Sequence, residues 1–307
     1  MKRQRIFSVF AMLVPFALAF TSCDLIDGII NPGVVHKKLE IDFTSSHNNN
    51  NSTYAVGDVV LSDGKVVKKA SVSNMTDEQK AAAVAVIFYA GDSEGTLGEK
   101  VLGVGLQNTN GESPQTLGWV GDMYDVQAQW LSIDKIQCSM TKIYYDPYEG
   151  NDFPVEFENS GSVVEIAGFY GDTDGSDNWT ALVAALRSKG YDDTGKPGNY
   201  PAWEWVNSYA EKHSLGGTNY VDGWYMPSIA ELCFLGITNS AVNASLSAAG
   251  GSQMTGAYFS STQVSAGDTG HVWSVRVDDE NHEGGYINAS ASMWDDRHYK
   301  VCCIRAF

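Results

Sequence analysis

After Gly250 the spacing of the apolar residues changes from a helical period to alternation, and this change limits the folds available to the chain. Residues 258–262, 272–277, 286–291 and 299–307 have strand patterns, separated by glycine-rich or acidic turns. Helical patterns precede them at residues 179–189, from Pro201 to His213 and from Ser228 onward. Helices followed by an antiparallel sheet predict an α+β domain, with the helices packed on a twisted sheet.

The earlier part of the domain has shorter elements. Strands are expected at residues 56–61, 84–89 and 101–106, whereas residues 124–145 fit either a helix or irregular structure. Thr76 and Ser228 each begin a capping box and so predict helix starts. The core-facing positions predict that four side chains are buried together: Trp224, Leu232, Trp273 and Ile304.

The first residues have the order of an export signal. Lys2, Arg3 and Arg5 precede an apolar run over residues 6–20, which is too short for a comfortable membrane span. Small residues then precede Cys23, as in a bacterial lipobox, although Phe20 stands where leucine is usual. We therefore expect a lipoprotein signal peptide over residues 1–22 and lipidation of Cys23; an ordinary signal peptide is the alternative.

Residues 23–53 are expected to form a flexible tether, because they include a polar run over residues 47–52 that has nothing to bury. The folded domain is then expected over residues 54–307. With 43% hydrophobic residues the chain can bury a sizeable core. Its formal charge of −17 disfavours binding to nucleic acid or directly to an anionic membrane.

The remaining cysteines are Cys138, Cys233, Cys302 and Cys303. No two of them form a Cys-x-x-Cys pair, which disfavours a zinc knuckle. Cys302 and Cys303 should point to opposite faces of a strand. A disulfide from Cys233 to one of them and free buried thiols both remain open.

Two polar patterns bear on metal binding. Residues 171–177 resemble the first half of a calcium loop, but Val183 stands where the closing glutamate should be, so an acidic turn capping the next helix is the simpler interpretation. The six histidines form no His-Glu-x-x-His motif. The sequence therefore predicts no metal and no cofactor, and it has no nucleophile elbow, Walker loop or dinucleotide fingerprint.

Residues 222–232, with the sequence DGWYMPSIAEL, resemble the GWYLPsixEL signature of the Lcl carboxy-terminal, collagen-binding adhesin-like family of bacterial surface lipoproteins. Residues 258–262 are similar to that family's YWSST element, with Phe259 in place of tryptophan, and residues 272–275 and 301–305 match its last strands. The resemblance extends over residues 54–307. It implies a C-type-lectin-like fold of the formylglycine-generating-enzyme branch, which includes the variable proteins of diversity-generating retroelements.

Two departures from the relatives matter. The enzymes use a reactive cysteine pair in their late strands, whereas Cys302 and Cys303 are adjacent in an apolar strand, so the chain is expected to be non-catalytic. Trp294-Asp295-Asp296 resembles one element of a calcium-dependent sugar site, but the accompanying Glu-Pro-Asn or Gln-Pro-Asp triplet is missing.

The resemblance implies a binding face on the late strands and loops, where aromatic and polar residues mix. We expect the ligand, a protein or host-matrix component, to contact Asp279, Asn281, His282, Tyr286, Asn288, Trp294, Asp295, Asp296, Arg297, His298 and Tyr299. Neighbouring strand ends of the antiparallel sheet are expected to bring the two polar segments together. The alternatives are a structural envelope lipoprotein without a specific ligand, an enzyme of the formylglycine-generating type, and, for Trp294, a buried anchoring role.

Overall fold

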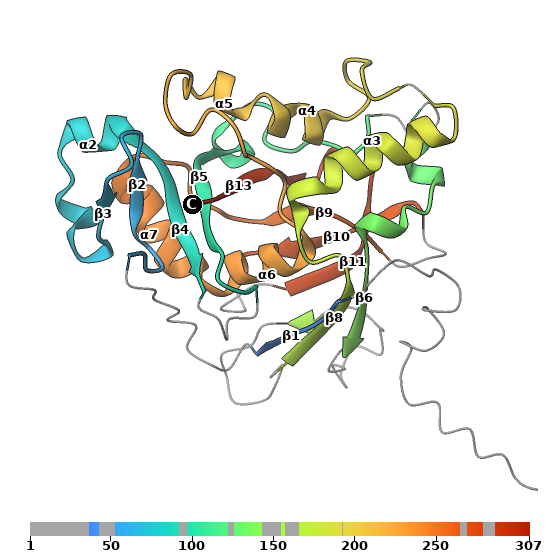
Figure 1. Cartoon of the computed structure of the whole chain (residues 1–307), viewed down its shortest axis with the longest axis horizontal. Coiled ribbons are helices and arrows are strands. Elements are labelled where there is room, and N and C mark those ends of the chain that lie inside the picture. Colours follow the sequence, from blue (N-terminus) through green and yellow to red (C-terminus); the bar gives the residue numbers. More distant parts are fainter. Residues whose placement is uncertain are drawn as a thin grey trace, which may run out of the picture. The chain divides into compact units, whose positions relative to one another are not determined.

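The computed structural model describes residues 37–42, 53–91, 97–121, 126–142, 155–156, 166–191, 193–264, 269–278 and 286–307. All of them belong to one compact unit that begins at Lys37. Helices and two sheets make up this unit, which confirms the α+β class (Figure 1).

The larger sheet has eight strands, of which seven follow the order β1-β8-β6-β9-β10-β11-β7, with β12 paired to β9. The strands are β1 (Lys37–Asp42), β6 (Gln137–Lys142), β7 (Val155–Glu156), β8 (Ile166–Gly171), β9 (Ala257–Val264), β10 (His271–Arg276), β11 (Tyr286–Ser292) and β12 (Tyr299–Lys300). Because β6 and β12 both run parallel to β9, the sheet is mixed and not purely antiparallel as expected.

The smaller sheet is antiparallel and has the order β13-β5-β4-β2-β3. Its strands are β2 (Val59–Leu61), β3 (Val66–Val67), β4 (Ala83–Ala90), β5 (Val101–Asn108) and β13 (Cys302–Ala306). The expected single strand over residues 299–307 is therefore wrong. The chain passes from one sheet to the other at Val301, whose N–H donates to Thr109 Oγ1 and whose carbonyl accepts from the Thr109 N–H.

Strand β1 lies inside the segment expected to be a tether. Residues Lys37–Asp42 pair along their whole length with β8, so the tether prediction over residues 23–53 is wrong for this stretch. Leu39 and Ile41 alternate with charged residues, which is the pattern of a strand. The tether prediction was based on the polar run over residues 47–52 and did not take this pattern into account.

The helices are α2 (Asp77–Ala82), α3 (Asn178–Ser188), α4 (Pro201–Asn207), α5 (Tyr209–Lys212), α6 (Ile229–Ile237) and α7 (Asn239–Ala249), with 3₁₀ turns η1 (Lys69–Asn74), η2 (Thr109–Gly111), η3 (Gln127–Trp130), η4 (Asp134–Ile136) and η5 (Gly175–Asp177). Both predicted capping boxes are confirmed. The expected helix from Pro201 to His213 is broken at Ser208, and a second helix follows α6. Among the described helices none alone is long and apolar enough to cross a membrane; α6 and α7 meet that requirement only as a pair, and they are bent by 78°.

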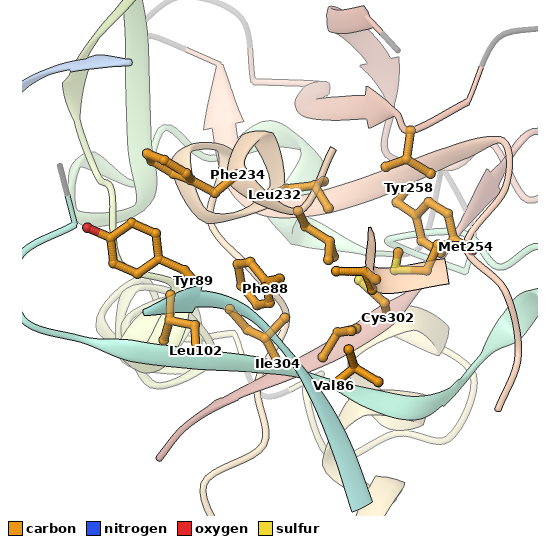
Figure 2. Close-up of a cluster of buried hydrophobic side chains, with 14 of the residues drawn as sticks. Val86, Phe88, Tyr89, Leu102, Leu232, Phe234, Met254, Tyr258, Cys302 and Ile304 are labelled. Carbon is orange, nitrogen blue, oxygen red and sulfur yellow. The ribbon is translucent and has the colours of Figure 1, made fainter. Parts of the chain in front are cut away.

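The smaller sheet is buried on both faces. Val86 and Phe88 of β4 belong to one hydrophobic cluster, whereas Ala85 and Ile87 belong to the other. Figure 1 shows α6 and α7 on one side of β4 and β5, and α4 and α5 on the opposite side. Figure 2 shows the first cluster, in which side chains of α6 meet those of β4 and β13.

The predicted core is confirmed for Leu232, Trp273 and Ile304, which are buried in the first cluster. The prediction is wrong for Trp224, which is half-buried and packs against the second cluster. The backbone of Tyr225 exchanges two hydrogen bonds with Ile304, and Tyr225 itself packs on the first cluster. Successive residues of extended backbone point to opposite sides, so Trp224 faces away from Ile304.

Candidate functional site

The predicted ligand-binding residues are only partly within the described structure. Cys23, Asp279, Asn281 and His282 lie outside it. Tyr286 and Asn288 are placed by their backbone alone, on β11 opposite Arg276 and Ser274 of β10. Residues 294–299 are described in full.

The strand register fixes the two ends of β11. Tyr286 pairs with Arg276 at one end of the β10–β11 pair, whereas Ser292 pairs with His271 at the other end. The connection between the strands therefore enters β11 at Tyr286, and the 293–298 turn leaves β11 after Ser292. A strand rises about 3.3 Å per residue, so seven-residue β11 holds these ends about 20 Å apart. The expectation that the two polar segments share one surface stays untested, because residues 279–283 lie outside the described part of the chain.

Asp295 organises the turn that follows β11. Its Oδ1 accepts the Arg297 N–H at 3.0 Å, its Oδ2 lies 2.6 Å from His298 Nδ1, and its own N–H donates to the Ser292 carbonyl. Burial raises the pKa of this carboxyl, but the hydrogen bonds with His298 and Arg297 outweigh it, so the pKa of Asp295 lies below its usual value. The side chain of Asp295 therefore fixes the turn from inside.

Three successive side chains of the turn point outward. Asp296, Arg297 and His298 are exposed, and the Arg297 and His298 side chains are 79% and 63% accessible. The Asp296 carbonyl accepts from Thr116 Oγ1 at 2.6 Å, which holds the backbone beneath them. Trp294 is half-buried beside His271 and packs on the second cluster, so it is an anchor at the edge of this surface.

Tyr299 is not a surface residue. It is 9% exposed, belongs to the second cluster and stacks on Phe259 with ring centroids 4.5 Å apart. Its assignment to the binding face is therefore wrong as far as direct ligand contact is concerned. The structure leaves Asp296, Arg297 and His298 as one contiguous exposed group, which we call the display turn.

The four cysteines of the domain are buried and free. Cys302 lies in the first cluster and Cys303 in the second, which confirms that they point to opposite faces. Burial raises the pKa of both thiols above the usual value. A buried, protonated thiol is a poor nucleophile, so neither cysteine has the environment of a reactive one.

The acidic segment around Asp172 is partly buried and is not a simple surface turn. Asp172 Oδ1 accepts the Asp174 N–H, and its Oδ2 accepts from Asn178 Nδ2 and Thr262 Oγ1. Lys100 pairs with Asp174 at 2.5 Å. The sequence analysis did not predict that Glu231 is fully buried next to this segment. Its position in the second capping box was the available signal, because the box directs its side chain toward the Ser228 N–H.

Within the described part of the chain, no group of three or more histidine, cysteine, aspartate or glutamate side chains is arranged to hold a metal ion. Comparison with known proteins adds no assignment: no family model, no curated protein and no solved structure matches this chain.

Proposed function

We propose that this chain is a lipoprotein anchored through Cys23 to the bacterial outer membrane or cell surface, where it binds a protein or host-matrix ligand without catalysing a reaction. In this proposal the α+β unit is a C-type-lectin-like domain, of the kind diversified in retroelement variable proteins. It uses no cofactor, binds no nucleic acid and meets the membrane only through its lipid. The support for the family is the set of ordered motifs in residues 222–232, 258–262 and 301–305.

The observation behind the binding role is the display turn. Its backbone is already held by Asp295 and Thr116, and Tyr299 immediately after it is anchored in the core. Binding to a preorganised loop loses little conformational entropy. Arginine is also among the residues that contribute most at protein interfaces.

The chemistry of the display turn favours a partner with a carboxylate or another acceptor-rich group. The carboxylate of Asp295 is used inside the turn, so Arg297 and His298 are the outward-facing donors. A planar guanidinium pairs bidentately with carboxylates. Because the whole chain is strongly acidic, we expect local contacts to drive this recognition rather than long-range attraction.

The burial and raised pKa of Cys302 and Cys303 argue against the enzymatic alternative, which needs a reactive cysteine pair. The second alternative, a structural envelope lipoprotein, predicts no specific ligand. A binding measurement separates it from the display role.

The test uses the mature chain with Cys23→Ser, screened against immobilised host-matrix proteins and envelope extracts. Once a ligand is identified, Arg297→Ala combined with His298→Ala should weaken binding at least tenfold, since loss of an interface arginine costs about 1–2 kcal/mol or more. Arg187→Ala with Lys189→Ala is the matched control, because both side chains are exposed at the far end of α3. Equal binding by parent, variant and control would move the site elsewhere, with residues 144–152, outside the described structure, as the next candidate.

A further inference from the structure

An acidic cluster in the interior joins three parts of the fold. The turn from Asp172 to Asn178 connects β8 to α3, Glu231 belongs to α6, and Lys100 precedes β5 of the smaller sheet. Glu231 is fully buried, and Asp172 above it keeps only part of its surface exposed. Neither acid belongs to the display turn, so a role for this cluster is independent of the proposed binding function.

Asp172 is held by donors from three directions. Its Oδ1 accepts the Asp174 N–H at 3.1 Å, and its Oδ2 accepts from Asn178 Nδ2 at 2.6 Å and from Thr262 Oγ1 at 3.2 Å. Thr262 Oγ1 in turn accepts the N–H of Ile229, the first residue of α6. The carboxyl group therefore ties the turn to β9 and to the start of α6.

Glu231 ties the same turn to the loop before α6. Its Oε2 accepts the Gly175 N–H at 3.0 Å and the Ser228 N–H at 2.9 Å, and its Oε1 accepts from the Tyr225 hydroxyl at 2.9 Å. The contact with Gly175 is close, because a Cβ atom there would lie 2.4 Å from the Met226 carbonyl oxygen and 2.7 Å from the Ser228 nitrogen. The turn at Gly175 and the loop before α6 therefore pack so closely that residue 175 has no room for a side chain.

The charges in the cluster do not balance when every acid is ionised. Asp172, Asp174 and Glu231 supply three carboxyl groups, whereas Lys100 supplies one ammonium, 2.5 Å from Asp174 Oδ2 and 4.0 Å from Glu231 Oε1. The other titratable groups facing the cluster among the described residues are Tyr225 and Cys138, and burial raises the pKa of both, so they stay neutral. Burying uncompensated charge is unfavourable unless a proton neutralises it.

Burial raises the pKa of Asp172 to about 7, and the charge of Glu231 adds to the rise, although the hydrogen bonds from Asn178, Asp174 and Thr262 oppose it. Burial also raises the pKa of Glu231, with the charge of Asp174 contributing. Both shifts agree with the charge count.

We propose that the turn Asp172–Asn178 is a pH-sensitive clasp, closed while Asp172 and Glu231 retain a proton between them and released when both are ionised. Release separates the turn from the loop before α6, so that water surrounds the two carboxylates. The device makes an acidic surrounding favour the closed state.

The direction of the pH effect follows from linkage. The closed clasp binds a proton more tightly than the open one, so closure is fully favoured below the ordinary carboxyl pKa of about 4 and weakens as the pH rises toward 7. Over that window the opening constant should rise up to about tenfold per pH unit, and it should level off above pH ~7.

The test is hydrogen–deuterium exchange of the full mature chain between pH 5 and 8, with rates corrected for intrinsic exchange and followed in peptides covering residues 172–178. In the parent, protection at Asp174 and Gly175 should fall with pH, because their N–H groups donate to the two carboxyls. Asp172→Asn, a neutral mimic of the protonated acid, should lose most of this pH dependence. Asp177→Asn is the matched control: Asp177 lies in the same turn, is exposed and makes no side-chain cap, so its variant should behave like the parent.

Carboxyl ¹³C titration of the parent provides a measurement that requires no variant, and one aspartate should titrate near pH 7. Protection that is independent of pH in the parent, or an equal loss in Asp172→Asn and the parent, would overturn the clasp. So would calcium-dependent recovery of protection at pH 8, which would instead make the cluster a metal site.

Discussion

Adjacent residues at the end of the display turn have opposite roles. His298 is 63% exposed at its side chain and hydrogen-bonds only within its own turn among the described contacts, whereas Tyr299 is buried and stacks on Phe259. From residue type alone, both His298 and Tyr299 are expected to contact the ligand. What separates them is that β12 begins at Tyr299 and pairs with β9, so its side chain enters the core.

This contrast predicts different effects on stability. Tyr299→Ala should lower the free energy of unfolding by about 3 kcal/mol, because a large buried aromatic side chain is removed and leaves a cavity. His298→Ala should change it by less than about 1 kcal/mol, since only an exposed hydrogen bond is lost. Urea unfolding of both variants checks the pair. Equal destabilisation would mean that Tyr299 is not in the core.

At the scale of elements, the two capping boxes allow a comparison in one chain. Thr76 caps α2 at the surface, whereas Ser228 caps α6 in the buried region that contains Glu231. In both boxes the cap side chain accepts an N–H of the first turn and the third residue reaches back to the cap N–H. The motif is the same, but if the cap side chain is removed, water can replace it as the hydrogen-bond acceptor only at Thr76, which is exposed.

We therefore predict that Thr76→Ala costs about 0.5–1 kcal/mol and Ser228→Ala about 2 kcal/mol, because the second change leaves the Glu231 N–H buried without a partner. Chemical denaturation of the two variants measures the difference. Each cap serves as the other's control, and a cost at Ser228 no larger than that at Thr76 would contradict the burial argument.

The starts of α4 and α6 could be predicted from the sequence, because a capping residue or a proline at the first helical position acts within one turn of the helix. The division into two sheets was not predicted, because the pairing of β13 with β5 joins residues about two hundred positions apart. Residues 296–298 were expected at the surface and are exposed, whereas Tyr299 was expected there and is buried. The place of Tyr299 depends on the pairing of β12 with β9, and the alternation of apolar residues alone does not specify that pairing.

On the scale of the whole molecule, the distance from the proposed anchor to the folded unit is set by β1. Thirteen residues lie between Cys23 and Lys37, the first residue of β1. An extended chain spans at most about 3.3–3.6 Å per residue, so the unit begins within about 50 Å of a lipidated Cys23. A tether ending at residue 53 would have allowed twice that reach. In the proposed lipoprotein the folded unit is thus held close to the membrane surface, and the chain's overall formal charge of −17 would keep it from contacting anionic lipid directly.

Because a single cysteine is expected to make this attachment, the last prediction concerns Cys23. Cys23→Ala should prevent acylation, so that the protein either keeps its signal peptide or is released in soluble form. One acyl chain gives only marginal membrane binding, whereas two or more give stable anchoring, so loss of the lipid should remove the attachment almost completely. Membrane fractionation combined with mass spectrometry of the amino-terminal peptide measures both effects. Ser22→Ala is the control, because it keeps a small residue before the cysteine and should still yield the acylated form. Mature, acylated protein in the membranes of the Cys23→Ala strain would show that the anchor lies elsewhere.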